Sequence, residues 1–236
     1  MRCTKSNRQS RWTTMEIPSF SELMSTRFGA EDIDKVKTAT AFFADRYAHY
    51  GFDNRTPWNT TIMAKYTAQH CLDCARKGLA LYGQPGRGKT HAMRVLGRIR
   101  GMRFVRARDI VDEWQRFGAN KRTEFWDWIN GERIVGHDPY WRDIIIDDIG
   151  TEPTLNEYGT KQEVIDTVIA RRTTEYTDNE ALTCLTFNLP LEPPKGGGDS
   201  IRARYGDRFL SRIHELCHVV QFRGNDWRRE QPKETP

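Results

Sequence analysis

The stretch LALYGQPGRGKT, residues 79–90, decides the fold of this chain. A short apolar run is followed by glycines at positions 83, 86 and 88, and then by Lys89 and Thr90. Glycine adopts backbone angles that are closed to other residues, so such a loop can turn its N–H groups toward one anion. The spacing fits G-x-x-x-x-G-K-[ST], a phosphate-binding loop. We therefore expect a strand over 79–82, a phosphate-binding loop, and then a helix over 91–100.

In this interpretation, the loop binds ATP together with Mg²⁺. Lys89 reaches the β- and γ-phosphates, and the hydroxyl of Thr90 is a ligand of the metal ion. The N-terminus of the following helix adds the positive end of its dipole. The alternative is a glycine-rich turn with an incidental lysine. The residues predicted to bind the nucleotide are Gly83, Gln84, Pro85, Gly86, Arg87, Gly88, Lys89, Thr90 and His91.

The run IIIDDIG, residues 144–150, predicts a second part of the site. Consecutive isoleucines are typical of a strand that is covered on both faces in a parallel sheet, and we expect this strand over 143–146. Asp147, at its carboxyl end, is predicted to hold Mg²⁺. Asp148 is predicted to orient or deprotonate the attacking water. The alternative is that two acidic residues merely end a strand.

Asn188 is a candidate for a third part of the site. It follows a strand that we expect over 181–187. An amide at that place can bridge the water and the γ-phosphate, although asparagine is also common at strand ends.

Strands and helices alternate from the loop onward, which produces βαβ units. We therefore expect an α/β fold: a three-layer αβα P-loop NTPase with a parallel five-stranded sheet and an N-terminal helical extension. Two further strands are expected, over 103–106 and over 217–222. Three further helices are expected: one with Asp109 as its N-cap, one over 160–175 and one over 205–216.

Four parts are predicted along the chain. Residues 1–28 are expected to form a flexible basic arm, and 29–77 a helical extension with helices near 31–50 and 58–77. The P-loop ATPase domain is expected over 78–229, and 230–236 form a polar tail.

Composition favours an intracellular protein with a polyanionic partner. The formal net charge is +5, and arginines concentrate within 94–108 and 202–229. Each arginine suits a DNA path or a merely solvated surface. No apolar run reaches the roughly 18 residues of a membrane span, and the N-terminus lacks the apolar region of a secretion signal. We expect a cytoplasmic protein with no membrane partner.

The five cysteines argue against a disulfide framework, because their number is odd in a chain expected to be intracellular. Cys71 and Cys74 form a C-x-x-C pair, but a structural zinc site needs four ligands. We therefore favour a helix over a zinc site for this stretch. Its inner face is formed by residues that recur at every fourth position: Ile62, Tyr66, His70 and Cys74.

The order of motifs resembles the AAA+ ATPases of the DnaC/IstB type, which are bacterial and phage helicase loaders and transposition ATPases. The motifs are YGQPGRGKT, IIIDDIG, LTFNL and YGDRFLSRI, within residues 75–229. The resemblance implies a P-loop fold of AAA+ type and a homo-oligomer that binds ATP between subunits. It implies Asn188 as sensor 1 and Arg212 as an arginine finger reaching a neighbouring subunit's γ-phosphate, with Arg208 as a second candidate. The chain departs from the family at Asp148, where glutamate is common.

The aromatic stretch over 114–128 falls where the resembling loaders carry a helix that contacts single-stranded DNA. Its basic residues can neutralise phosphates, and its aromatic rings can stack on bases. The alternative is that the rings belong to the core. The candidate contacts are Arg116, Lys121, Arg122, Phe125, Trp126 and Trp128.

These observations predict an ATP-hydrolysing, DNA-associated switch of the helicase-loader type, slow by itself and stimulated by assembly or DNA. The expected partners are single-stranded DNA and a replicative helicase or a transposase. A transposition accessory ATPase is the nearest alternative. A nucleotide-gated adaptor that hardly hydrolyses ATP is another. A P-loop small-molecule kinase would need an acceptor pocket and an arginine-bearing lid, and a sensor-like Asn188 argues against it.

Overall fold

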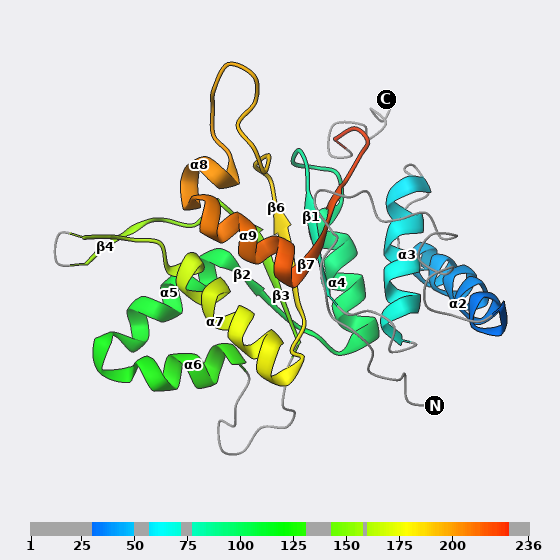
Figure 1. Cartoon of the computed structure of the whole chain (residues 1–236), viewed down its shortest axis with the longest axis horizontal. Coiled ribbons are helices and arrows are strands. Elements are labelled where there is room, and N and C mark those ends of the chain that lie inside the picture. Colours follow the sequence, from blue (N-terminus) through cyan, green and yellow to red (C-terminus); the bar gives the residue numbers. More distant parts are fainter. Residues whose placement is uncertain (1–29, 50–56, 72–76, 131–142, 158–159, 227–236) are drawn as a thin grey trace, which may run out of the picture.

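The fold is built on a parallel sheet. The computed structural model of the chain describes residues 30–49, 57–71, 77–130, 143–157 and 160–226. The strands of this sheet are β1 (Gly78–Tyr82), β2 (Arg103–Arg106), β3 (Ile144–Ile149), β6 (Thr183–Phe187) and β7 (Cys217–Gln221). They pair in the order β2-β3-β6-β1-β7, and every pair is parallel (Figure 1). The predicted α/β fold with a five-stranded parallel sheet is confirmed.

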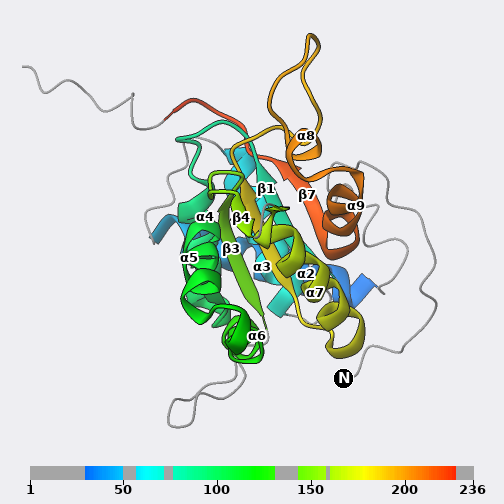
Figure 2. The ribbon, with the colours of Figure 1, turned by 90° about the vertical axis from the view of Figure 1, so that its left-hand side faces the viewer.

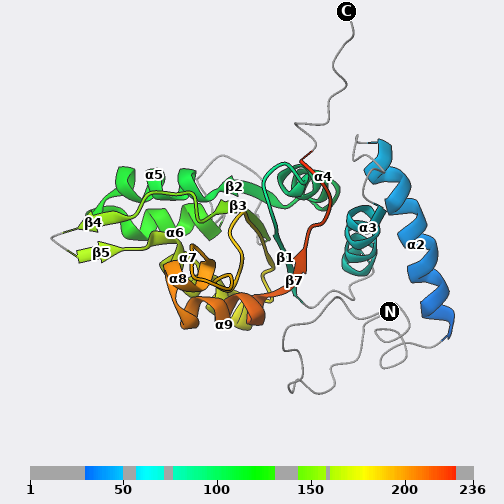
Figure 3. The same ribbon diagram turned by 90° about the horizontal axis from the view of Figure 1, so that it is seen from above.

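Helices cover both faces of the sheet. Figure 3 shows α4, α3 and α2 following one another on one side, and α5, α6, α7 and α9 on the other. Their bounds are α2 (Ala30–His49), α3 (Pro57–Cys71), α4 (Lys89–Arg100), α5 (Ala107–Phe117), α6 (Arg122–Asn130), α7 (Val164–Asn179), α8 (Ile201–Tyr205) and α9 (Asp207–Leu216), with a 3₁₀ turn, η1 (Ala119–Lys121), before α6.

The central strands alternate between two hydrophobic clusters, because successive side chains of a strand point to opposite faces. In β3, Ile144 and Ile146 belong to the cluster under α5, α7 and α9, whereas Ile145 belongs to the cluster under α3 and α4. In β1, Ala80 faces the first cluster, and Leu79 and Leu81 face the second. Since both faces are buried, the strands are apolar throughout, as the sequence predicted.

The boundary of β3 differs from its prediction. The strand does not end before the acidic pair but runs through it to Ile149, and its pairing with β6 shifts register between Ile146 and Ile149. Asp148, within this irregularity, has a left-handed φ of 63°. Such a bulge re-aims side chains at the end of a strand.

A short hairpin after β3 was not predicted. Its antiparallel strands are β4 (Leu155–Glu157) and β5 (Thr160–Gln162), and α7 begins only at Val164. The prediction that a helix begins at 160 is therefore wrong, whereas its four apolar positions are buried as expected: Val164, Ile165, Val168 and Ile169.

Two further boundaries are corrected. The single helix predicted over 205–216 is divided into α8 and α9 at Gly206, whose φ is 86°. The N-cap of α5 is Arg106 rather than Asp109, which lies in the first helical turn. There its negative charge still meets the positive end of the helix dipole.

Polar contacts join α2 to α3, and α3 to the chain after β7. Between the two helices, the hydroxyls of Tyr47 and Thr67 lie 2.9 Å apart. From α3, the buried Asn59 donates to the carbonyl of Arg223 at 2.9 Å and accepts from its N–H at 3.1 Å. The chain just after β7 is thereby tied to the first turn of α3.

Several expectations fall on residues outside the described ranges. These are the arm over 1–28, the tail over 230–236, and Cys74. Within the described ranges, no group of three or more His, Cys, Asp or Glu is placed to hold a metal ion. No helix of the described residues is long and apolar enough to cross a membrane.

Replacing Asn59 by alanine is expected to destabilise the chain by about 2 kcal/mol, because the buried Asn59 amide and its two hydrogen bonds to the backbone of Arg223 are lost. Urea unfolding measures this loss. Asn179→Ala is the matched control: its amide bonds Glu175 on an exposed helix surface, and its loss should cost less than about 0.5 kcal/mol. Equal effects of the two substitutions would show that Asn59 does not anchor α3.

Candidate functional site

The predicted site residues meet at one edge of the sheet. Strands in a parallel sheet end at the same edge, so the segments that follow β1, β3 and β6 are brought together there. Figures 1 and 2 place the segment after β1, the long loop after β6 and α8 at this edge. Residues separated by about a hundred positions in the sequence thus become neighbours.

The glycine loop joins β1 directly to α4. Gly86 and Gly88 have φ values of 80° and 83°, which a side-chain-bearing residue rarely adopts. Gly88 caps α4 in this left-handed conformation, and no side chain caps the helix. The backbone N–H groups in the first turn of an α-helix have no acceptor within the helix, so the N-terminus of α4 favours an anion.

Lys89 lies inside the curve of the loop. Its ammonium donates to the carbonyls of Gly83 at 2.7 Å and Gln84 at 2.9 Å, and the residue is only 5% exposed. A buried lysine held by loop carbonyls is a fixed positive charge beside the N-terminus of α4. The loop therefore combines backbone donors and a cation.

Asp147 connects three elements at the edge of the sheet. Its Oδ1 accepts from the hydroxyl of Thr90 on α4 at 3.0 Å and from the hydroxyl of Thr186 on β6 at 2.7 Å. Among the described residues, no donor bonds its second oxygen, Oδ2. The Thr90 hydroxyl and the Asp147 carboxylate are oxygen ligands of the kind that Mg²⁺ takes, usually together with waters and phosphate oxygens.

Burial governs the charge of Asp147, which is 2% exposed. Desolvation raises the pKa of this carboxyl above its usual value, and the hydrogen bonds from Thr186 and Thr90 act in the opposite direction. The neighbouring Asp148 raises the pKa further, and Arg94 lowers it. A bound cation would compensate the buried charge.

Asp148 and Asn188 are in direct contact. The amide of Asn188 donates to Oδ1 of Asp148, and the Asp148 N–H donates to the Thr186 hydroxyl at 2.8 Å. Thr151 donates to the Asp148 carbonyl at 2.8 Å. The structure thus brings Asn188 to the acidic pair, and the unusual backbone of Asp148 is held on several sides.

The other predicted loop residues lie around this centre. Arg87 donates to the carbonyl of Phe222 at 2.9 Å and to the side chain of Gln84 at 3.1 Å, which fixes the outer side of the loop. Gln84, Pro85 and His91 are exposed.

The two candidate finger residues lie on α9. Arg212 donates to Asp166, in the first turn of α7, at 3.0 Å within the same chain. Arg208 is exposed and makes no hydrogen bond or ion pair with any described residue. One candidate is therefore engaged internally and the other is open to solvent.

The aromatic stretch mainly packs α5 against α6. Phe125 is fully buried, so the hypothesis that it stacks on bases is wrong. Arg103 covers the ring of Trp128 at 4.3 Å, and Arg122 covers that of Trp114 at 3.5 Å.

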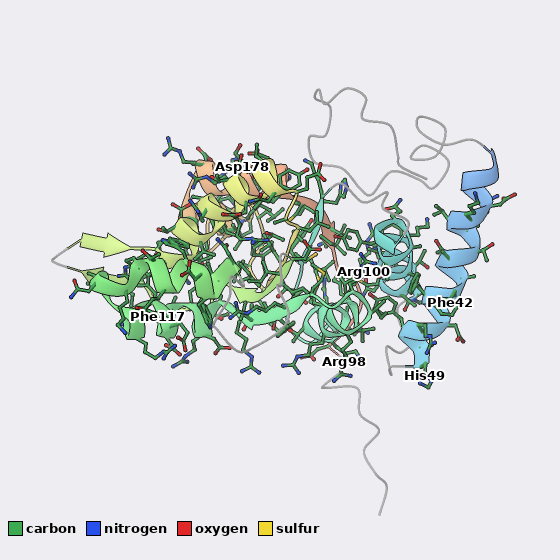
Figure 4. All side chains as sticks on the ribbon, turned by 90° about the horizontal axis from the view of Figure 1, so that it is seen from below. Phe42, His49, Arg98, Arg100, Phe117 and Asp178 are labelled. Carbon is green, nitrogen blue, oxygen red and sulfur yellow. The ribbon has the colours of Figure 1, made fainter. Side chains whose placement is uncertain are left out.

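Figure 4 shows Phe117, at the end of α5, far from Phe42 of α2, with Arg98 and Arg100 of α4 between them.

Thr186 was not predicted, although it bonds both acidic residues of the site. It lies inside the buried strand β6, two residues before Asn188. A hydroxyl within an apolar strand was the available signal, because buried polar groups require partners.

The parallel sheet and the glycine loop between β1 and α4 define an α/β P-loop fold. No protein-family model and no curated protein matches the chain at a significant level. A solved structure titled as the DnaC helicase loader is 18% identical, with a TM-score of 0.49, over 72% of this chain and 92% of that one. A DnaI structure is 19% identical, with a TM-score of 0.46, over 70% and 83%.

Asp147→Asn is expected to stabilise the nucleotide-free chain at neutral pH. A carboxyl whose pKa is raised by folding is ionised at pH 7 at a cost to the folded state, and this cost disappears as the pH falls through the raised pKa. The amide keeps an Oδ1 acceptor for both threonines. We expect the melting temperature to rise by about 2 to 4 °C at pH 7, the equivalent of about 1 kcal/mol in a chain of this size.

The gain in melting temperature should shrink as the pH is lowered toward the ordinary range of an aspartate. Asp199→Asn, on the exposed loop before α8, is the control and should not change the melting temperature at pH 7. A lower melting temperature of Asp147→Asn at pH 7 would contradict a destabilising buried charge.

Proposed function

We propose that the chain binds ATP with Mg²⁺ and hydrolyses it slowly, as a switch in a DNA-associated assembly. The observation that supports this most is the contact between Thr90 and Asp147, 3.0 Å apart although 57 positions separate them. An incidental glycine turn would not need a hydroxyl and a buried carboxylate converging beside the lysine.

The roles of the binding residues follow from their chemistry. The N–H groups of the loop and of the first turn of α4 bind the phosphates, and the Lys89 ammonium exchanges its carbonyl partners for phosphate oxygens. Thr90 and Asp147 would hold Mg²⁺, which supplies charge neutralisation at the phosphates. Arg87, His91 and the remaining loop residues line this binding site.

The hydrolytic roles are proposed for Asp148 and Asn188. Asp148 orients the attacking water and accepts its proton, and Asn188 fixes the direction of the Asp148 carboxylate through the hydrogen bond between them. Because aspartate is shorter than glutamate, its reach toward the water is smaller. Slow basal turnover that rises on assembly is consistent with this arrangement.

The proposed assembly is a homo-oligomer on single-stranded DNA, in the cytoplasm, with a replicative helicase as partner. The order of motifs supports the helicase-loader role, and a net charge of +5 suits a polyanion. Exposed arginines on α4, β2 and α5 can contact phosphates. They are Arg94, Arg98, Arg106 and Arg108. A transposase in place of the helicase would indicate the transposition ATPase.

Lys89→Ala should abolish stabilisation of the fold by Mg²⁺ and ATP, since the main fixed charge at the phosphates is lost. In the wild type, ligand at 100 times the Kd should add about 2.7 kcal/mol. Thermal unfolding with and without Mg-ATP measures the difference. Lys195→Ala, on an exposed loop, is the control and should retain the full increment. Equal increments in all three chains would refute the phosphate-binding loop.

Arg212→Ala should leave ATP affinity nearly unchanged but reduce turnover, by about 10³-fold or more if the arginine completes a neighbouring site. Mixing this variant with Lys89→Ala should restore some turnover, because Lys89→Ala subunits supply the arginine to intact loops. ATP turnover is measured against the mixing ratio, with DNA present. A self-contained kinase would give no such rescue.

The ion pair with Asp166 provides the control for this experiment. Asp166→Asn removes the internal partner of Arg212 but leaves the arginine in place. If Arg212 acts only within its own chain, both substitutions should lower turnover alike. Turnover retained in Asp166→Asn and lost in Arg212→Ala supports the shared site, and the same mixing experiment with Arg208→Ala tests the second candidate.

A further inference from the structure

The segment directly after Asp148 is held by a buried carboxylate. The side chain of Glu152 is 1% exposed, and its Oε2 accepts from the Gly150 N–H at 2.8 Å. Its Oε1 accepts from the hydroxyl of Tyr205, and Arg204 forms an ion pair with it at 3.4 Å. The carboxylate thus joins α8 to the backbone of residues 149–152, which directly follow Asp148 and are called the acidic loop below.

Arg204 also bonds this segment directly. One guanidinium nitrogen donates to the carbonyl of Gly150 at 2.6 Å, and the other donates to the carbonyl of Glu152. The same side chain lies 3.6 Å from Glu163, which accepts from Thr154 at 2.8 Å. Arg204 therefore holds two backbone carbonyls and two carboxylates around one turn.

Burying a charge in this way is costly unless each group is paired and hydrogen-bonded. A surface loop could end β3 without any of these groups. In this chain the turn must instead support Asp148, whose left-handed φ of 63° costs about 1 kcal/mol or more unless the surroundings hold it. Asn188 holds the carboxylate of Asp148, and the contacts of Glu152 and Arg204 hold the backbone two residues further on.

We propose that Glu152 and Arg204 are positioning residues that hold Asp148 in the orientation needed to act on the water. This inference rests on the proposed ATP hydrolysis. Arg204 lies on α8, which continues after Gly206 into α9 with Arg208 and Arg212. Movement of these helices against a neighbouring subunit is thereby transmitted to Asp148 through the Arg204 contacts.

Arg204→Ala tests this role. Turnover at saturating Mg-ATP should fall about tenfold to a hundredfold, as expected for a displaced reacting group, while the Kd for Mg-ATP stays within about twofold. Arg202→Ala is the matched control on the same helix: Arg202 pairs with the exposed Glu192 and Asp207 and does not contact the acidic loop. Its turnover should equal that of the wild type.

Guanidinium ion gives a readout that a purely structural role would not produce. Arg204 is 21% exposed, so a small cation can enter the space that the truncated side chain leaves. Added guanidinium should restore part of the turnover of Arg204→Ala and should leave the turnover of the Arg202→Ala control unchanged. If Arg204→Ala does not fold, Tyr205→Phe, which removes one donor to Glu152, should still lower turnover more than it lowers ATP affinity.

The outcomes separate this inference from the proposed function. A wild type that binds ATP but does not turn it over contradicts the proposed hydrolysis, and the positioning role is overturned with it. A wild type that hydrolyses ATP, with Arg204→Ala equally active, overturns the positioning role alone. Parallel losses of ATP affinity, stability and turnover, without guanidinium rescue, show a structural role and also overturn it.

Discussion

The buried carboxylate of Asp147 is the interaction on which the site depends. It accepts hydrogen bonds from α4 and from β6 while belonging to β3, so it fixes three elements that are distant in sequence. Without its two threonine donors, an isolated carboxylate at this depth would be strongly unfavourable. Thr90 and Thr186 therefore stabilise a charge that the fold itself does not require. The buried carboxylate lowers the stability of the protein, and it places a carboxylate oxygen beside the Thr90 hydroxyl.

Thr186 bonds Asp148 as well as Asp147. Thr186 donates its hydroxyl to Asp147 and accepts the N–H of Asp148, so one side chain fixes both acidic residues. A shift of β6 relative to β3 would move the acidic pair together rather than separately. Asn188 lies at the end of the same strand and contacts Asp148. Strand β6 is therefore the element that relates Asp147 and Asp148, the proposed metal-binding and water-activating residues, to each other.

The sheet and its loop could be predicted from sequence because their signals are local. The apolar runs of β1 and β3 and the glycine spacing between β1 and α4 each specify one structure within a few residues. The β4–β5 hairpin lacks such a signal, since its strands are short and polar, and the break at Gly206 is one glycine in a helical pattern. Glu152 has no local signal at all. Its burial depends on Arg204, which lies about fifty residues later, so its role becomes visible only when α8 packs against the acidic loop.

Different contacts tie the two sides of the candidate site to the rest of the fold. On one side, Asn59 ties the chain after β7 to α3, and Arg87 of the glycine loop bonds Phe222 of the same segment. On the other side, Arg204 ties α8 to the turn after Asp148. A displacement of the glycine loop would reach α3 through the segment of Phe222 and Arg223, and a displacement of α8 would reach Asp148 through Arg204. Because both routes use backbone carbonyls as acceptors, they transmit displacement of the main chain and do not require a change of charge.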